Sequence, residues 1–502
     1  MESTSQPVIF TTQTSFPLPY QKFFIPTSWR RYHLSQLVNK ALSLSKIVPF
    51  DFLVKGEILR TSLGEWCAEH GVGEEETLEI EYIESVLPPQ KLSDFPHDDW
   101  VSSVSCQPDG YFVTGSYDGI VRMFNYSRTL ITSSKLHNAP ITSITTMDDA
   151  SYTSNSAQLV ATASHDLTAL LTRFTQTSDD QEDQEDSNLS TTTTTTKATP
   201  LAALHLHTSP LTCITSNENS THLLTASWDS LIGVWDTKVP GEHEIGDIRA
   251  SAPGPSRKRR KVVEEEQDEQ WAAEGAGVNG GPNRSTVTVV VETKNVKRKA
   301  PITVLKSHKS RVSCALFGSQ FRGIEGRAYS CGFDSTVRVW DVETGLCEHT
   351  INASEKAFTS LALPSTNLAV ATATDRSMTM YDLRIPTTAV PAAPESSYMH
   401  PSTPSCIALP SYSGPKAQSA TSSVTSVNEV ITGAYDGIVR MWDLRSTKSA
   451  VTSFDAFGNE RDKDSKKVLA VDWNAEKGVV GIGGEGGFVV WSFKEDVVSS
   501  RS

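Results

Sequence analysis

Short apolar runs separated by polar turns recur along the chain from about residue 100 to its end. In each unit an apolar run that contains small residues comes first, as at residues 112–114, 223–225 and 430–432. A turn with Asp, often followed by Gly, comes next, and a second alternating run then ends in an aromatic side chain. This pattern predicts a pair of antiparallel strands joined by a tight turn in every unit.

The unit occurs seven times. Residues 117–125 return almost unchanged as residues 435–443, with Asp118 and Asp436 at the same place in the turn. Seven units predict a ring of seven four-stranded blades, which leaves only short, protected edges. The outer strand of the last blade must come either from residues before Trp100 or from residues 492–502, and we favour the N-terminal side.

Residues 7–85 lack this unit and have a pattern of their own. Apolar alternation predicts strands at residues 8–12, 22–26, 50–54, 58–59 and 77–82. Helical spacing predicts one helix at 34–44, with Ser35 as a candidate N-cap, and another at 62–70 that is ended by Gly71. The order strand-strand-helix-strand-strand-helix-strand is that of a ubiquitin-like β-grasp domain.

The fold class is therefore mainly β, a seven-bladed propeller preceded by an α+β ubiquitin-like domain. We expect the ubiquitin-like domain at residues 7–85, a proline-stiffened connector at 86–99 and the propeller at 100–495. Two insertions interrupt the propeller. Residues 176–199 are acidic and then rich in Thr, residues 237–300 are rich in Pro, Gly and charge, and both compositions predict disorder.

Composition narrows the class of protein further. Apolar residues make up 38% of the chain, a low share that the two insertions explain. Seven scattered cysteines without a CxxC pair argue against a metal site and for free thiols in a reducing compartment. No apolar run approaches the roughly 18–20 residues of a membrane span, and the N-terminus lacks the features of a secretory signal.

Charge gives two opposing indications. A net charge of −14 argues against a general nucleic-acid binder, because phosphate neutralisation needs a basic face. The insertion at 237–300 nevertheless ends in a basic triplet at residues 297–299 and contains a longer cluster, Arg257, Lys258, Arg259, Arg260 and Lys261. Basic clusters in such a context indicate a nuclear localisation signal. A solvated charge run and an RNA contact are the alternatives.

Histidines precede several of the repeated units, at positions 137, 207, 308 and 400. A His–Asp pair can act as a general base. Here the pair recurs from blade to blade without a shared nucleophile, whereas an active site is needed once, so we prefer a structural interpretation. Arg122, Arg338 and Arg440 occupy equivalent places in their units. They are either ordinary exposed strand residues, which we prefer, or part of a basic surface.

The repeated unit resembles the WD repeat. In that family the turn Asp, the upstream His, a strand Ser or Thr and the strand Trp form a buried hydrogen-bonded set within a blade. The resemblance implies one such set that contains His207, Asp229 and Trp235. It implies a second set that contains His308, Asp334 and Trp340.

The two domains together resemble the Ytm family of ribosome biogenesis factors, whose N-terminal part is called the NLE domain. The segments that carry the resemblance are residues 49–53, 59–63, 86–89 and 99–103. The related Notchless family shares the N-terminal domain but has a larger propeller, so seven repeats favour Ytm. The resemblance covers both domains and excludes the insertions.

This resemblance implies a non-catalytic assembly factor for the large (60S) ribosomal subunit, located in the nucleolus and nucleoplasm. The propeller would bind the Bop/Erb WD-repeat factor in a complex with pescadillo. The ubiquitin-like domain would be gripped by the metal-dependent adhesion site of midasin, an AAA ATPase that removes the factor from the pre-60S particle. No membrane contact is implied.

The adhesion site makes a specific chemical demand. A partner-held Mg²⁺ with an incomplete shell needs one more carboxylate oxygen, carried by a protruding loop. Residues 71–76 form such a loop with three consecutive acids, and alignment to the family pattern selects Glu75, with Glu74 and Glu76 as neighbours. Without the resemblance, an acidic loop chosen for solubility would be the preferred interpretation. We expect no cofactor of the chain's own.

Two other classes remain as alternatives. WD propellers also serve as substrate receptors of ubiquitin ligases, and a fold alone does not decide function. An enzyme is disfavoured because no phosphate-binding Gly-rich loop, Ser/His/Asp set or metal cluster stands outside the repeated units.

Overall fold

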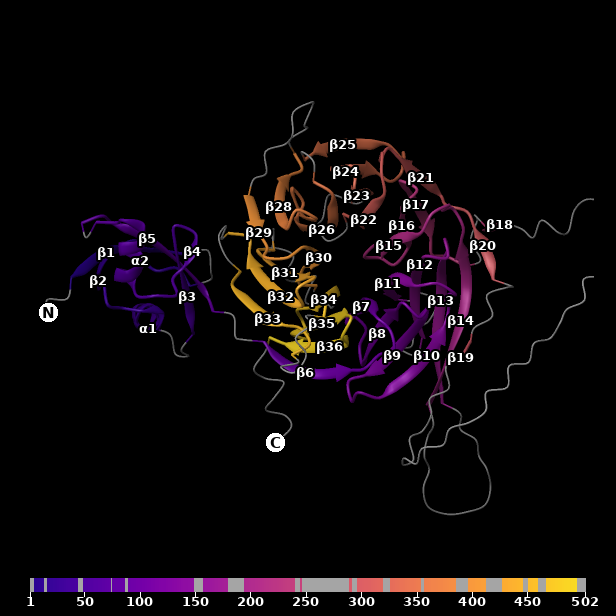
Figure 1. Ribbon diagram of the computed structural model, residues 1–502, viewed down its shortest axis with the longest axis horizontal. Helices are drawn as coiled ribbons and strands as arrows, with labels where there is room; N and C mark the ends of the chain where they lie inside the picture. The colour runs from indigo at the N-terminus through magenta and orange to yellow at the C-terminus, as the bar shows by residue number, and fades with distance from the viewer. Residues whose placement is uncertain are drawn as a thin grey trace, which may run out of the picture.

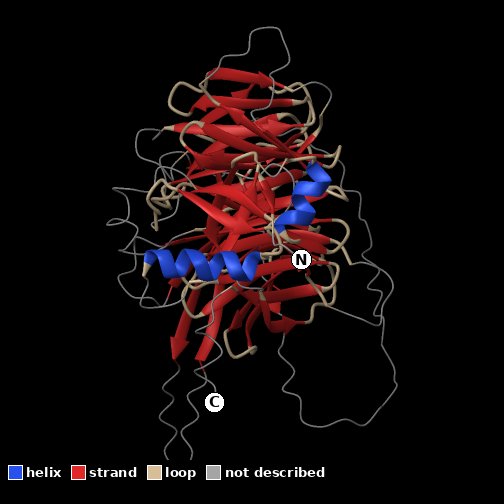
Figure 2. Cartoon of the chain, turned by 90° about the vertical axis from the view of Figure 1, so that its left-hand side faces the viewer, coloured by secondary structure: helices blue, strands red, loops and turns tan. Residues whose placement is uncertain are grey.

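The structure is a computed structural model of the 502-residue chain. The residues it describes are 4–12, 16–43, 48–73, 75–85, 89–148, 157–178, 194–239, 244–245, 289–290, 296–318, 326–353, 356–384, 396–411, 427–445, 450–458 and 466–493. An N-terminal α+β domain lies beside a ring of β-sheets (Figure 1). Within the described residues, α-helix is confined to the N-terminal domain, whose two helices lie in front of the propeller strands in Figure 2.

The N-terminal domain is a five-stranded sheet with two helices. Its strands lie in the order β2-β1-β5-β3-β4, and β1 pairs with the central strand β5 in parallel. The elements are β1 (Ser5–Thr11), β2 (Lys22–Pro26), α1 (Arg31–Leu42), β3 (Phe50–Val54), β4 (Glu57–Ile58), α2 (Leu63–His70) and β5 (Leu78–Glu84). This is the predicted β-grasp order. The helices pack on one face of the sheet around Leu34, Trp66 and Tyr82.

The sequence placed the start of the second helix correctly and that of the first helix too late. Ser62 caps α2, where its hydroxyl accepts from the Glu65 N–H at 3.3 Å, and Gly71 ends the helix in the left-handed conformation (φ +64°). Helix α1 begins at Arg31, so Ser35 is not its N-cap. The Ser35 hydroxyl accepts instead from the Phe50 N–H at 3.1 Å, which ties α1 to β3.

Seven four-stranded antiparallel sheets, or sheets with such a core, form the ring. We number these blades in chain order. Blade 1 holds β7 (Val101–Ser105), β8 (Tyr111–Ser116), β9 (Ile120–Asn125) and β10 (Leu130–Lys135); blade 2 holds β11 (Ile141–Asp148), β12 (Ala157–Ser164), β13 (Ala169–Ser178) and β14 (Thr194–Leu204); blade 3 holds β15 (Leu211–Ser216), β16 (His222–Ser227), β17 (Leu231–Asp236) and β21 (Thr303–Lys306).

The remaining blades continue round the ring to the closing strand. Blade 4 holds β22 (Val312–Phe317), β23 (Arg327–Gly332), β24 (Thr336–Asp341) and β25 (Cys347–Asn352); blade 5 holds β26 (Phe358–Ser365), β27 (Leu368–Ala373), β28 (Ser377–Asp382) and β29 (Ser396–Met399); blade 6 holds β30 (Pro404–Ala408), β31 (Glu429–Ala434), β32 (Ile438–Asp443) and β33 (Thr452–Asp455); blade 7 holds β34 (Val468–Asn474), β35 (Val479–Gly484), β36 (Gly487–Ser492) and β6 (Gln90–Phe95).

The ring is closed from the N-terminal side, the alternative that the sequence analysis favoured. Strand β6 pairs with β36, and Phe95 stands opposite Phe488 with their ring centres 5.1 Å apart. Residues 86–99 are therefore not wholly a connector, because β6 lies inside that interval and the propeller begins before residue 100. The sequence analysis favoured a closing strand before Trp100 but did not locate it, because a single strand at the far end of the domain lacks the repeated turn that marks the other strands.

The insertions are shorter than composition suggested. Strands β13 and β14 pair from Ala169 to Ser178 and from Thr194 to Leu204, so both ends of the predicted 176–199 insertion are strand. Within 237–300, the described residues include β18 (Glu244–Ile245), β19 (Val289–Val290) and β20 (Lys297–Lys299). Strand β19 adds to the sheet of blade 1, and strands β20 and β18 add to the sheet of blade 2. Thr-rich sequence favours strand once a long partner is available, because branched side chains fit a pleated sheet.

Candidate functional site

The turn between the second and third strand of each blade carries one acid, and a basic side chain pairs with it. This pairing extends over all seven blades, although the basic residue differs. The pairs are Asp118–Arg122, Asp166–His137, Asp229–His207, Asp334–His308, Asp375–Lys356, Asp436–Arg440 and Glu485–Lys467. Their repetition in every blade marks them as part of blade construction.

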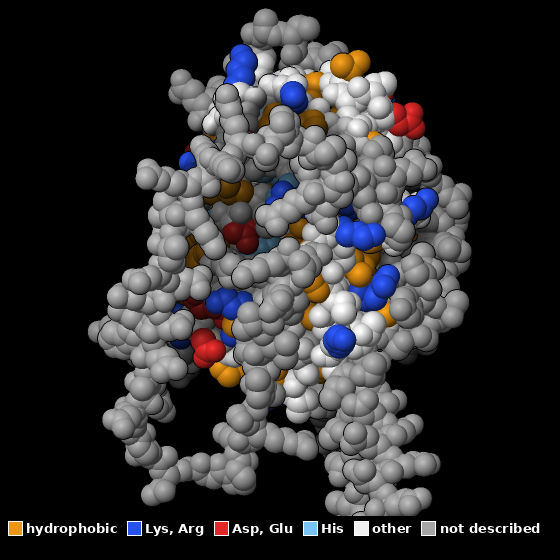
Figure 3. Space-filling view, turned by 90° about the vertical axis from the view of Figure 1, so that its right-hand side faces the viewer, with side chains coloured by type: hydrophobic (Ala, Val, Ile, Leu, Met, Phe, Trp, Pro, Cys, Tyr) orange, Lys and Arg blue, Asp and Glu red, His pale blue; other side chains and the backbone are white. Residues whose placement is uncertain are grey.

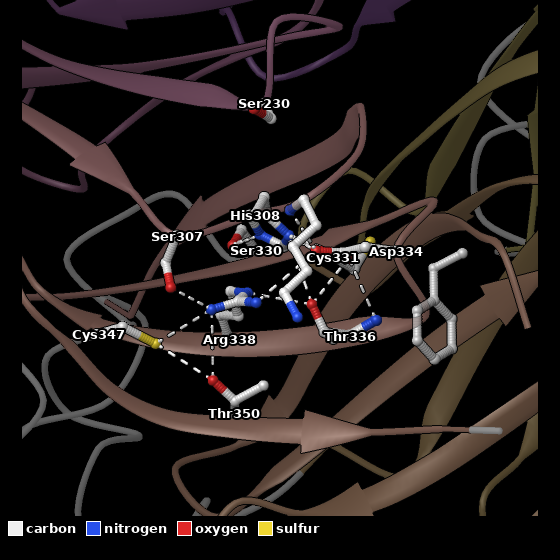
Figure 4. Close-up of polar contacts among 12 residues, drawn as sticks. Ser230, Ser307, His308, Ser330, Cys331, Asp334, Thr336, Arg338, Cys347 and Thr350 are labelled. Carbon is white, nitrogen blue, oxygen red and sulfur yellow. Dashed lines mark hydrogen bonds and ion pairs between the residues drawn. The ribbon is translucent and has the colours of Figure 1, made fainter. Parts of the chain in front are cut away.

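In blades 3 and 4 the pair is extended to the strand Trp. His308 Nδ1 lies 2.9 Å from Asp334, and His308 Nε2 lies 2.7 Å from the Ser330 hydroxyl (Figure 4). The Trp340 indole N–H donates to the same hydroxyl at 2.8 Å. Blade 3 repeats the arrangement with His207, Asp229, Thr225 and Trp235. The structure thus brings together both residue sets that the WD resemblance implied.

The direction of these bonds follows from the donors available. The carboxylate only accepts, so Nδ1 carries the proton and Nε2 accepts from Ser330, whose oxygen in turn accepts from Trp340. Burial lowers the pKa of His308, which keeps the imidazole neutral although Asp334 stands beside it. Burial also opposes ionisation of Asp334, but hydrogen bonds from His308, the Lys309 N–H and Thr336 hold the pKa of that carboxyl far below its usual range. These groups are fully used within the blade and support a structural role.

Arg122 and Arg440 hold the turn Asp of their blades, as His does in blades 3 and 4. Arg122 Nη2 lies 2.7 Å from Asp118, and Arg440 Nη2 lies 2.6 Å from Asp436. Both side chains are only 8% exposed. Arg338 is also buried and donates to the Ser307 and Thr336 hydroxyls, while His308 keeps the closer contact with Asp334 (Figure 4).

Neither interpretation proposed for these arginines was right. They are not exposed strand residues, and they do not form a basic surface. Each third strand is covered on both faces, because a blade is packed between two neighbours, so strand alternation does not predict exposure here. A buried guanidinium then requires a carboxylate, and the turn Asp four residues earlier supplies it.

His400 shows the consequence of this exchange in blade 6. Because Arg440 holds Asp436, neither ring nitrogen of His400 has a hydrogen-bond partner among the described residues, although the residue is only 3% exposed. Its ring lies 4.7 Å from that of Trp442. Burial, with Arg440 nearby, lowers the pKa of His400 to about 4. His400 therefore acts as a packed neutral ring.

The carboxylate loop of the N-terminal domain is a predicted functional element that the described structure leaves exposed. Glu75 lies in the turn between α2 and β5 and is exposed. The buried side chain of Gln6 donates to the Gly73 carbonyl at 3.1 Å and to the Glu76 carbonyl at 2.6 Å, on either side of Glu75. Lys22 on β2 donates to the Thr77 hydroxyl at 3.2 Å. The loop is thus fixed at its base while Glu75 projects at its tip.

The three acids of this loop are not equivalent. Glu76 lies 3.8 Å from Lys55, and Glu74 lies outside the described residues. For Glu75, by contrast, no hydrogen bond or ion pair joins its carboxylate to a described residue. A carboxylate on a fixed loop, free to bind elsewhere, fits the ligand that an incomplete Mg²⁺ shell requires. Within the described part of the chain, no group of three His, Cys, Asp or Glu side chains could hold a metal ion by itself.

Sequence analysis missed Gln6, the residue that braces this loop. The available signal was a polar residue at the start of an otherwise apolar strand, where a buried amide needs partners that are distant in sequence. Glu76 and Gln6 are 70 positions apart, which no local pattern reveals.

The predicted basic clusters have different fates. The cluster Arg257, Lys258, Arg259, Arg260 and Lys261 lies outside the described residues. Lys299, from the second cluster, is only 1% exposed and donates to the Asp236 carbonyl at 2.7 Å, so it links β20, in the sheet of blade 2, to the end of β17 in blade 3. On the visible described surface in Figure 3, Lys and Arg side chains are spread among apolar and uncharged ones without forming a continuous stripe. Neither described helix has the length and apolar character to cross a bilayer.

Comparison with known families assigns both domains. Residues 7–67 match the NLE (NUC135) domain. Residues 89–125, 198–236, 299–341 and 410–443 match the WD domain, G-beta repeat. The first WD match includes β6, which agrees with its place in the propeller.

The similarity of this chain to known proteins extends over nearly its whole length. The ribosome biogenesis protein YTM1 of Laccaria bicolor is 52% identical over 98% of this chain and 95% of its own. That of Coprinopsis cinerea is 49% identical over 97% of this chain and 95% of its own. The YTM1 protein of Saccharomyces cerevisiae is 29% identical over 92% and 90% of the two chains.

Proposed function

The chain belongs to the YTM1 family of ribosome biogenesis proteins, and on that premise we propose that it is a non-catalytic assembly factor of the large ribosomal subunit. It acts in the nucleolus and nucleoplasm, in maturation of the large-subunit rRNAs. Its propeller binds the Bop/Erb factor in a complex with pescadillo. The non-catalytic role is supported by the turn acids, each of which pairs with a basic side chain in all seven blades.

We further propose that midasin removes the chain from the pre-60S particle by gripping Glu75. The observation that supports this is the exposed Glu75 carboxylate on a loop whose base is fixed by Gln6. A fixed loop can transmit a pull to the sheet, because Gln6 lies in β1 and β1 pairs with the central strand β5. The bond itself joins a carboxylate oxygen to a Mg²⁺ held by the partner.

The test is binding of the full chain to the adhesion domain of midasin in Mg²⁺. Glu75→Ala removes the metal ligand, so the affinity should fall by at least about thirtyfold, the effect of deleting one member of a desolvated charge pair. Chelation of Mg²⁺ should weaken the wild type equally. Glu69→Ala is the matched control, because Glu69 is an exposed acid on α2 of the same domain. Undiminished binding of the Glu75→Ala variant would disprove this role of the residue.

The broader assignment is tested separately by purification of the tagged chain from nuclear extract. Recovery of large-subunit rRNA precursors with pescadillo and the Bop/Erb factor is expected for wild type and for Glu75→Ala. Recovery of cullin subunits without precursor rRNA would instead indicate a ubiquitin-ligase receptor. The basic cluster at residues 257–261 is proposed to direct the nuclear import that this function requires.

A further inference from the structure

The ubiquitin-like domain touches the propeller at blade 6. Arg60, which follows β4, donates from Nη2 to the Ala450 carbonyl at 3.2 Å. Arg445, which follows β32, places Nη1 3.9 Å from the Glu81 carboxylate on β5. Figure 1 shows the N-terminal domain on this side of the ring. The two contacts join segments that are far apart in the sequence, since Glu81 and Arg445 are separated by 364 positions.

A cavity of about 260 Å³ lies in this contact and is lined by both domains. The ubiquitin-like domain contributes the end of β5, and blade 6 contributes β31, β32 and the residues after it. The lining side chains are Ile83, Glu84, Glu429, Met441, Trp442, Asp443, Arg445 and Val451. The two domains are therefore not close-packed over this part of their contact.

Arg445 is a cation that lies among several acidic side chains at this contact. It forms a bidentate pair with Asp443, whose side chain is 4% exposed, with Nε–Oδ1 at 2.9 Å and Nη2–Oδ2 at 2.5 Å. It also approaches Glu81, while Glu84 and Glu429 line the same cavity. Burial raises the pKa of Glu81, Arg445 opposes that rise, and Asp443 adds to it. Arg445 therefore offsets the repulsion between the carboxylates of Glu81 and Asp443, which belong to different domains.

Blade 5 contains the same local structure without a second domain. Residues 381–384 read Tyr-Asp-Leu-Arg, and residues 442–445 read Trp-Asp-Leu-Arg. Arg384 pairs with Asp382 as Arg445 pairs with Asp443, with Nε–Oδ1 again at 2.9 Å. The Arg384 side chain is 67% exposed, whereas that of Arg445 is 18% exposed. The pair with Asp is thus a local feature of the blade, and the covering of Arg445 is what the second domain adds.

The contact also sets the direction of the Glu75 loop. Ile83 and Glu84 lie at the C-terminal end of β5, whereas the loop of Glu75 leads into its N-terminal end. Seven residues of strand separate the two ends by roughly 20 Å. The domain is therefore held with one end of β5 at the propeller and the Glu75 loop at the other.

We propose that Arg445 is the central residue of a reversible inter-domain latch, formed by the contacts of Arg445 with Glu81 and of Arg60 with Ala450. This latch holds the ubiquitin-like domain against blade 6 with the Glu75 loop directed away from the propeller. The latch rests on the Arg445–Glu81 ion pair and the Arg60–Ala450 hydrogen bond, and relative motion is the default for two domains without a large apolar interface. It opens when the domain is pulled or when the attraction is screened by salt. The latch does not depend on which partner binds Glu75, so it can fail or hold independently of the proposed function.

The test is the distance distribution between two dyes on the full chain, measured by single-molecule energy transfer. Labels enter through non-canonical amino acids at Tyr32 on α1 and Leu346 in blade 4, which are 67% and 66% exposed. Wild type should give one short-distance population that shrinks as salt increases. Arg445→Ala should increase the ratio of open to closed molecules by at least about fivefold, the lower range of coupling between sites.

Arg384→Ala is the matched control, because it removes the same Arg–Asp pair from blade 5 and should leave the distribution within about twofold of wild type. Arg60→Ala provides a second variant that leaves the propeller intact and should also favour the open population. A distribution that is the same in wild type, Arg445→Ala and Arg60→Ala would overturn the proposal. Equal opening in Arg384→Ala would also overturn it, because general loosening of the propeller would then explain the effect.

Discussion

The turn networks make a quantitative prediction that compares two histidines at the same place in different blades. His308 in blade 4 and His400 in blade 6 are buried to a similar extent, with 7% and 3% exposed. Both ring nitrogens of His308 are hydrogen-bonded, since Nδ1 donates to Asp334 and Nε2 accepts from Ser330. Neither ring nitrogen of His400 is hydrogen-bonded to a described residue. Substitution of each by Ala removes a ring of the same size, so the difference between the two isolates the hydrogen bonds.

The magnitude follows from those bonds. His308→Ala loses one bond to a charged acceptor, about 1.5–3 kcal/mol, and one neutral bond, about 0.5–1.5 kcal/mol. It also creates a cavity, but His400→Ala creates a similar one, so the cost of the cavity cancels when the two variants are compared. We therefore expect His308→Ala to lower the free energy of unfolding by about 2–4 kcal/mol more than His400→Ala does.

The assay is urea unfolding of the full chain, followed by the fluorescence of its tryptophans, with the midpoint and the slope reported for each variant. Equal slopes are required for the comparison, because a changed slope signals a changed unfolded or native state. Ser330→Ala is a useful third variant, since it removes the oxygen that serves both His308 and Trp340. If His400→Ala were as destabilising as His308→Ala, buried volume and not hydrogen bonding would determine the stability of these blades.

Two further predictions concern acid and backbone conformation. Burial lowers the pKa of His97 and of His400 to about 4, against 6.5 for an unperturbed imidazole. Between these pH values the unfolded chain binds more protons than the folded chain, so the free energy of unfolding should fall as the pH is lowered from about 6.5 to 4. A urea midpoint of the wild type that does not move over this range would contradict the prediction. Gly119 has φ +78° and an added Cβ would lie 2.2 Å from the His137 carbonyl, whereas Gly110 has φ +89° with open space around it. Gly110→Ala should therefore cost about 1 kcal/mol through its backbone alone, and Gly119→Ala several kcal/mol, as measured by thermal unfolding.

Much of the architecture could be predicted because its signals are local and repeated. A turn acid between two apolar runs specifies two strands wherever it occurs, and seven occurrences, six with Asp and the last with Glu485, specify the ring. The ubiquitin-like order was readable for the same reason, since caps such as Ser62 and Gly71 act within one helical turn. Strand β6 lacked such a signal, and its partner β36 lies almost 400 positions away.

The partners of charged side chains were harder to predict, because a carboxylate can choose between bases that the sequence presents equally. Blade 6 has both His400 and Arg440 within reach of Asp436, and Arg440 takes the carboxylate. Blade 4 has both His308 and Arg338, and there His308 keeps the closer contact. The strand pattern is the same in the two blades, so the choice depends on neighbours such as Ser307 and Thr336, which engage Arg338.

Arg384 and Arg445 show that the sequence does not predict which of two equivalent residues contacts a second domain. The two residues share a motif, a local Asp partner and a bond of equal length, so neither sequence nor blade geometry distinguishes them. What separates them is that Glu81, on a domain folded from the other end of the chain, stands over Arg445 alone. A repeated protein supplies many equivalent positions, and a second domain gives one of them a distinct role simply by covering it. Among the described residues, the contact of Glu81 with Arg445 is therefore a place where a second domain breaks the repetition of the blades.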